Sequence, residues 1–225
     1  MNPLISFSMP IRSHLKMALK SINSILDNVS DVNNIEILLR IDIDDDIILH
    51  NLHRFESLPN VKVTIGDKMR GWLDNHHFHK ENCEISTGEF IQLWSDDLIM
   101  KTKDFDKIIQ HKYSSKTCVV SWEDGTEWVC APMISRNIYE ITGAFGKQTF
   151  CDSYLCEIGS QCEIYYYDSN INVIHDRYDI TGNNLHTEFR AQQKQYKSAI
   201  IEYRLQDTKE LLKNDINLIK NYLKQ

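Results

Sequence analysis

The stretch Glu89-Phe-Ile-Gln-Leu-Trp-Ser-Asp-Asp-Leu-Ile-Met100 decides how the rest of the chain is interpreted. It consists of two apolar runs separated by Ser95, Asp96 and Asp97. A strand that ends in two acids and is followed by more buried chain can hold a divalent cation, because Mg²⁺ and Mn²⁺ prefer oxygen ligands. The alternative is a solvated turn or a helix cap, where acids are also common. The spacing of the two acids alone does not separate these interpretations.

The composition bounds the class of protein. A chain of 225 residues that is 42% hydrophobic, with only 8 Gly and 4 Pro, can build the core of one domain with an appended tail. The net charge of −7 argues against broad non-specific binding to nucleic acid. No apolar stretch approaches the roughly 18 residues that cross a bilayer. We expect no signal peptide, free thiols at all six Cys, and a cytoplasmic protein, with association at a membrane surface left open.

Strand-like and helix-like segments alternate on the N-terminal side of the two acids. We predict strands over residues 4–9, 35–41 and 61–65, and helices over residues 12–26, with Ser13 as a possible cap, and 47–55. Strands and helices that alternate at this spacing form parallel βαβ units, and their right-handed crossovers bring the carboxyl ends of the strands to one edge. We therefore expect an α/β fold with a Rossmann-like mixed, mostly parallel sheet flanked by helices.

The rest of the chain is predicted to extend this sheet and end in a helical tail. We expect helices over residues 72–82, 105–111, 136–143 and 153–158, strands over 90–94, 117–122, 163–167 and 172–175, a hairpin between 117–122 and 128–131, and helix from about residue 186 onward. This gives a catalytic domain over residues 1–190 and a helical extension over residues 191–225 packed on it.

Clusters that contain charged residues follow the first four predicted strands, one after each. They are Pro10 with Arg12, then Asp42 with Asp44, Asp45 and Asp46, then Lys68 and Arg70, and finally Asp96 and Asp97. Each cluster alone could be a polar loop. A nucleotide-sugar needs this mixture at a shared edge, since the base and ribose need acceptors and the diphosphate needs cations or a metal.

Five segments, taken in order, resemble the family 2 nucleotide-sugar glycosyltransferases with the glycosyltransferase A fold. They are residues 5–12, the region of Asp42, residues 66–71, 88–97 and 133–140. The resemblance covers roughly residues 4–190, and Gly88-x-x-Ile91-x-x-x-x-Asp96-Asp97 is its most specific part. The chain departs from the family at Ser95, where the usual Asp-x-Asp motif has its first acid.

The resemblance implies metal-dependent transfer of a sugar from a nucleoside-diphosphate sugar, expected to be a UDP-sugar, to an acceptor hydroxyl with inversion. It places Asp97 on Mn²⁺ or Mg²⁺ and Asp96 on the ribose or a phosphate. The acceptor can be a glycan, a lipid-linked sugar or another hydroxyl compound. The nucleotide-binding set that follows from the shared edge and the resemblance is Pro10, Arg12, Asp42, Lys68, Arg70 and Asp96.

A further segment, residues 173–182, resembles the part of the family in which a His completes the metal site. His175 is the corresponding residue, and a hydrogen-bonded loop histidine is the alternative. Arg177 could instead neutralise the diphosphate.

Inverting transfer also requires a general base that deprotonates the acceptor hydroxyl. Asp152 occupies by order the position of the carboxylate that family members carry at the head of a helix. A simple N-cap is the alternative interpretation of Asp152, and Glu157 is the second candidate for the base.

Three further interpretations stay open at this stage. A nucleotidyltransferase would use a similar sheet, but Ser8–Ser13 lacks the Gly-rich loop of that class. A non-catalytic protein with the same fold is favoured by Ser95. His76, His77 and His79 could suggest zinc, but their spacing forms no tight ligand face on a helix, so we expect a solvated surface.

Overall fold

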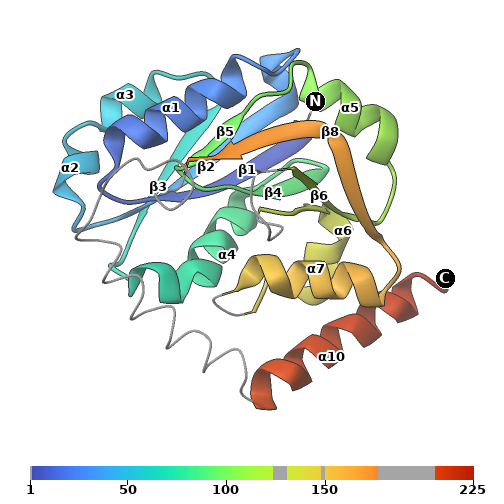
Figure 1. Cartoon of the computed structure of the whole chain (residues 1–225). Helices are drawn as coiled ribbons and strands as arrows, with labels where there is room; N and C mark the ends of the chain where they lie inside the picture. Colours follow the sequence, from blue (N-terminus) through green and yellow to red (C-terminus); the bar gives the residue numbers. More distant parts are fainter. Residues whose placement is uncertain (1, 124–130, 148–149, 177–205) are drawn as a thin grey trace.

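The computed structural model describes residues 2–123, 131–147, 150–176 and 206–225 (Figure 1). Its centre is an eight-stranded sheet with the order β3-β2-β1-β4-β7-β6-β8-β5. Pairing is parallel from β3 through β2 and β1 to β4, antiparallel for β4 with β7, β7 with β6 and β8 with β5, and parallel for β6 with β8. The strands are β1 (Ile5–Ile11), β2 (Ile35–Asp42), β3 (Val61–Gly66), β4 (Phe90–Leu93), β5 (Leu98–Met100), β6 (Val119–Glu123), β7 (Met133–Ser135) and β8 (Tyr165–His175). This is the mixed, mostly parallel sheet that the sequence predicts.

Helices cover both faces of the sheet (Figure 1). One layer contains α1 (Leu15–Leu26), α2 (Asp46–Leu49), α3 (Leu52–Glu56) and α5 (Phe105–Tyr113). The opposite layer contains α4 (Asn75–Ile85), α6 (Arg136–Thr142) and α7 (Cys151–Gln161), with α10 (Gln206–Tyr222) outside them. Short 3₁₀ turns, η1 (Val32–Asn34) and η2 (Gly71–Asp74), precede β2 and α4.

The central strands are buried on both sides, which is why their sequences read as nearly continuous apolar runs. Every residue of β2 is buried, including the polar ones. On the α1 side of the sheet, Phe7 packs edge-on against Trp94, at 5.3 Å between ring centroids, and against Phe105 at 5.9 Å. These contacts fix Trp94, the residue that leads into the acidic turn.

Three local predictions differ from the structure. The expected helix over residues 47–55 is two short helices, because Asn51 bonds back to the Ile47 carbonyl at 2.9 Å and ends the first one. The two expected strands near the end of the sheet are one strand, β8, whose irregular middle is held by the amide of Asn170 on the Asp168 carboxylate at 3.0 Å. The antiparallel partner of β6 is β7 (Met133–Ser135), and residues 128–130 of the expected hairpin lie outside the described part.

Helix α10 packs on α6 and α7 through a buried carboxylate. Asp215 is almost fully buried and accepts hydrogen bonds from the Tyr154 hydroxyl at 2.7 Å and from Lys147 at 2.6 Å. The predicted domain boundary at residue 190 and the predicted start of the helical tail lie outside the described residues, so both stay predictions. None of the helices in the described ranges combines the length and the apolar character that crossing a membrane requires.

Replacing Tyr154 with Phe should lower the free energy of unfolding by about 1–2 kcal/mol, because a buried carboxylate loses one of its hydrogen bonds. Tyr166→Phe is the matched control, since that side chain is exposed, and it should change stability by less than about 0.5 kcal/mol. Urea denaturation measures both values. Equal values for the two variants would show that Asp215 does not anchor α10.

Candidate active site at the carboxyl edge

The ends of β1 and β2 are joined by ion pairs. Arg12, which follows β1, binds Asp42 at 2.5 Å and Asp44 at 2.8 Å. Asp42 is 3% exposed and Arg12 is 41% exposed, so the pair runs from the interior to the surface. The Asp44 carboxylate, followed by the nearby Asp42, raises the pKa of the Arg12 guanidinium despite an opposing effect of burial. Pro10 lies half-buried on β1, opposite Arg40 of β2 in the parallel register.

Arg40 is the buried end of this network. Its side chain is fully buried and donates to Asp42 at 2.7 Å, to Glu81 of α4 at 2.5 Å and to the Asp67 carbonyl at 2.7 Å. The guanidinium lies so close to Gly66 that a Cβ there would meet Nη2 at 2.5 Å. Gly66 is therefore needed for the approach of β3 to Arg40, and Arg40 fixes the carboxylate of Asp42 from the inside.

Of the two cations after β3, Lys68 joins this network. Lys68 binds Asp44 at 2.6 Å and remains 64% exposed. The Arg12 hydrogen bond, then that of Lys68, lowers the pKa of Asp44 well below its usual range. Arg70 instead binds Asp74 at 2.5 Å, just before α4. The structure thus links Arg12, Asp42 and Lys68 through shared ion pairs, whereas Arg70 is paired with Asp74 at the start of α4.

The turn between β4 and β5 carries two carboxylates, and each faces an imidazole. Asp96 lies 3.3 Å from Nδ1 of His14, the residue that precedes α1. Asp97 lies 3.2 Å from Nε2 of His175, the last residue of β8. Ser95 also donates a short hydrogen bond to Asp97. The predicted neighbours Asp97 and His175, 78 residues apart in the chain, are therefore in contact.

His14 is a site residue that the sequence reasoning missed. We expected Ser13 to cap the first helix, but α1 begins at Leu15 with His14 at the cap position. Ser13 has a left-handed backbone, with φ of 62°, and its amide donates to Asp45 at 2.7 Å. The position of His14 in the loop after the first strand was the available signal, since that loop was expected at the carboxyl edge.

The environments of the two acids push their pKa values apart. Burial raises the pKa of Asp96, although His14 opposes this effect, and the neighbouring charge of Asp97 adds to it. Burial also acts on Asp97, but the hydrogen bond and charge of His175 and the bond from Ser95 outweigh it, and the pKa of Asp97 is lowered. Of the two carboxylates, Asp97 is therefore the one whose surroundings favour the charged form.

The chemistry of Asp97 and His175 fits one side of a cation site. Adjacent ligands of an octahedral ion at about 2.1 Å are about 3 Å apart, close to the spacing of Asp97 Oδ2 and His175 Nε2. Within the described residues, no group of three or more His, Cys, Asp and Glu side chains could hold a metal by itself. Ions such as Mg²⁺ commonly complete their shell with substrate phosphates and water.

Asp152 lies in the first turn of α7 and is not its N-cap. The helix begins at Cys151, Phe150 occupies the cap position, and the carboxylate of Asp152 accepts from the next amide, that of Ser153, at 2.7 Å. The side chain of Asn75 reaches Cys151 Sγ at 3.5 Å, so the N-termini of α4 and α7 are neighbours. Because α4 follows the carboxyl end of β3, this places Asp152 on the side of the sheet where α4 begins.

His76 and His79 of α4 are less exposed than expected, which corrects the prediction of a solvated surface for these two, whereas His77 is exposed as predicted. His79 is buried, and its Nδ1 lies 2.8 Å from the Ser8 hydroxyl of β1. Burial lowers the pKa of His79 to about 3 and that of His76 to about 4, so both are neutral. Helix α4 packs on β1 and β2, which explains why a polar residue on its inner face needs a partner such as Ser8.

The parallel half-sheet, its antiparallel extension and the acidic turn after β4 define a glycosyltransferase A fold. Solved structures of this class are similar to the chain. Mannosyltransferase PcManGT from Pyrobaculum calidifontis, in complex with GDP-Man and Mn²⁺, is 11% identical over 98% of this chain and 70% of that one, with a TM-score of 0.64. TarS 1–349 from S. aureus in complex with UDP-GlcNAc is 11% identical over 81% of this chain and 61% of that one, with a TM-score of 0.63.

A second TarS structure, in complex with UDP, is 12% identical over 77% of this chain, with a TM-score of 0.58. The chain spans 58–61% of the length of the TarS fragment in these two structures. No protein-family model and no curated protein sequence matches the chain. At these identities the likeness establishes the fold, and the roles of individual residues stay predictions.

Arg40→Lys should lower the free energy of unfolding by about 2–4 kcal/mol, because a single ammonium group cannot replace three donors aimed at Asp42, Glu81 and the Asp67 carbonyl. Arg54→Lys, on the exposed side of α3, is the control and should cost less than about 0.5 kcal/mol. Chemical denaturation tests both. A loss as small for Arg40 as for Arg54 would contradict its assigned role in fixing Asp42.

Proposed function

We propose that the protein is a metal-dependent glycosyltransferase. It transfers a sugar from a nucleoside-diphosphate sugar, first of all a UDP-sugar, to an acceptor hydroxyl. The observation that carries this proposal is the contact of Asp97 with His175 at the turn after β4. This contact lies at the same edge of the sheet as the ion pairs of Arg12 with Asp42 and Asp44. The fold supports it, because solved structures with that fold include glycosyltransferases in complex with GDP-Man or UDP-GlcNAc.

The charge pattern of the edge supports binding of a nucleoside diphosphate. Charges alternate along Arg40, Asp42, Arg12, Asp44 and Lys68, and exposure increases toward the outer end. The inner members are fixed by burial, so Asp42 would serve as an acceptor for the base or ribose. Phosphate oxygens would compete with Asp44 for the two exposed cations, Arg12 and Lys68. Pro10 and Arg70 would border the base on either side of this network.

Asp97 and His175 would hold the cation, Mn²⁺ in preference to Mg²⁺ because one ligand is an imidazole nitrogen. A divalent cation at this position would neutralise the charge of the diphosphate as it leaves. Asp96, directed at His14, would contact the ribose or a phosphate.

Asp152 would act as the general base in a single inverting displacement. Its carboxylate accepts the proton of the acceptor hydroxyl as the acceptor oxygen forms a bond to the anomeric carbon. The bond from that carbon to the phosphate oxygen breaks at the same time, and the nucleoside diphosphate leaves with the electron pair. Glu157 is less suited, because it lies further along α7 and accepts from Gln161 of the same helix at 2.5 Å.

A non-catalytic nucleotide-binding protein is the second candidate, and Ser95 favours it. The Ser95 hydroxyl donates to Asp97 where the glycosyltransferase motif would have an acid. Binding without turnover would identify this alternative.

Saturating UDP with Mn²⁺ should raise the melting temperature of the protein, because a ligand at 100 times its Kd stabilises the folded state by about 2.7 kcal/mol. Asp97→Ala should abolish the rise, and EDTA should reverse it. Glu140→Ala, which removes an exposed acid from α6, should retain it. A panel with GDP and other nucleotides identifies the base. If no nucleotide stabilises the wild type, the proposed function is wrong.

Asp152→Asn should bind the donor with unchanged affinity but release nucleoside diphosphate at least about 100-fold more slowly, because the proton acceptor is lost. Donor hydrolysis in the presence of Mn²⁺ gives the rate, and calorimetry gives the affinity. Glu157→Gln is the control and should keep the wild-type rate. Unimpaired turnover in Asp152→Asn would remove Asp152 as the base, and loss in Glu157→Gln alone would reassign the role.

A further inference from the structure

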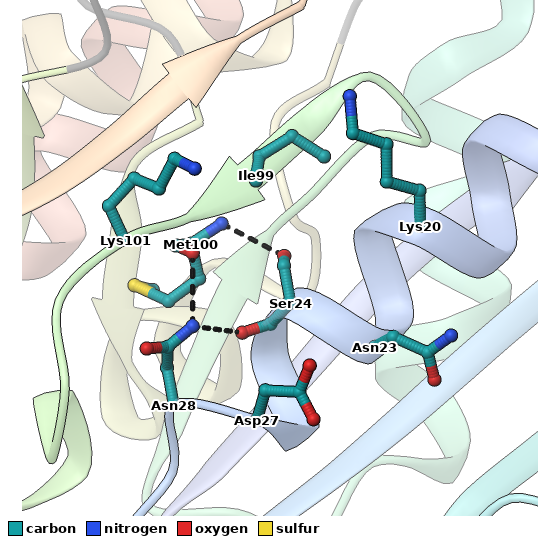
Figure 2. A pocket seen from close by; sticks show the side chains of 8 residues that line it. All are labelled: Lys20, Asn23, Ser24, Asp27, Asn28, Ile99, Met100 and Lys101. Atoms are coloured by element: carbon teal, nitrogen blue, oxygen red, sulfur yellow. Dashed lines mark hydrogen bonds between the residues drawn. The ribbon is translucent and has the colours of Figure 1, made fainter.

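Helix α1 takes the place of a neighbouring strand beside β5. Strand β5 is last in the sheet order, so one of its edges pairs with no strand of the described chain. Side chains of α1 and of the turn that follows it occupy that edge instead: the amide of Met100 donates to the hydroxyl of Ser24 on α1 at 2.9 Å, and Asn28, just beyond the helix, donates to the Met100 carbonyl at 3.2 Å (Figure 2). Ser21 and Ser24 are three residues apart and therefore lie on one face of the helix, and Asn28 reaches the same strand from the turn after it.

Ser21 is the member of this face that reaches the acidic turn. Its hydroxyl is fully buried and donates to the Leu98 carbonyl at 2.6 Å, with the Ser95 carbonyl at 3.2 Å. It also accepts the indole N–H of Trp94 at 2.8 Å. One hydroxyl therefore binds the residue before the turn and both carbonyls that flank Asp96 and Asp97.

The end of β8, which carries His175, is also bonded to the acidic turn and to α1. The amide of Asp176 donates to the Asp97 carbonyl at 2.7 Å, and Leu98 pairs with His175 in the antiparallel register of β5 and β8. Lys20, next to Ser21 on α1, binds the Asp176 carboxylate at 2.7 Å. Lys20 is largely exposed, so this ion pair contributes less than the buried hydroxyl.

We propose that Ser21 is a positioning residue for cation binding, acting through the backbone of the turn that carries Asp97. The inference rests on the proposed function, because it assumes that Asp97 and His175 hold the ion. Ser24 provides an internal comparison. It is also a serine of α1 bonded to β5, but its contact is at Met100, three residues beyond Asp97. Loss of Ser24 should weaken the packing of α1 on β5 without moving the turn.

The test compares Ser21→Ala with Ser24→Ala by calorimetric titration of Mn²⁺ in the presence of saturating UDP. Ser21→Ala should weaken Mn²⁺ binding about tenfold, the lower end of the effect seen when residues that orient metal ligands are removed. Ser24→Ala should change it less than twofold, even though both variants lower the melting temperature. Ser21→Cys keeps the side-chain size with a weaker donor and should fall between them, and it carries the test if Ser21→Ala does not fold.

Two results would overturn the inference, and they are distinguishable. Wild-type Mn²⁺ affinity in Ser21→Ala, or in Ser21→Cys where that variant carries the test, would show that Ser21 only stabilises the fold, while the proposed function would stand. The same conclusion would follow from equal losses of affinity in the Ser21 and Ser24 variants. Absence of Mn²⁺ binding by the wild-type protein would reject the proposed function and the role of Ser21 with it.

Discussion

The parallel register of β1 between β2 and β4 is the constraint on which the rest of the structure depends. It aligns Ile5 with Ile35 on one side and with Phe90 on the other, so these three strands end at the same edge. Main-chain pairing alone thus brings Arg12, Asp42 and the turn at Asp96 and Asp97 to one side of the sheet, although they are far apart in the sequence. The side-chain contacts at this edge follow from that alignment.

Burial of charge gives this edge its rigidity. Arg40 has no contact with solvent, and its cost of desolvation is offset only because all three of its donor nitrogens are satisfied. The network becomes progressively exposed through Asp42 and Arg12, so its inner half is fixed and its outer half is accessible. Asp96 and Asp97 follow the same principle, since each half-buried carboxylate faces an imidazole. Such a site combines a fixed frame with groups that can exchange partners.

The sequence predicted the fold and the shared edge because both depend on local patterns. Apolar runs define the strands from β1 to β4, and the polar residues that follow each strand must then meet at one edge. The pairing of β5 with β8 was not predicted, because β5 has only three residues and the paired residues Leu98 and His175 are 77 residues apart, a separation that no local sequence pattern indicates. The contacts between polar side chains of distant segments were also missed, as His79 with Ser8 and His14 with Asp96 illustrate.

The central claim is that the turn between β4 and β5, together with the end of β8, holds a cation and a diphosphate. The most direct test is a crystal structure grown with UDP and Mn²⁺, with diffraction recorded at the manganese absorption edge. The account predicts an anomalous peak bonded to Asp97 Oδ2 and His175 Nε2, with diphosphate oxygens completing the shell and the uridine near Asp42. A peak elsewhere, or nucleotide bound away from this edge, would contradict it.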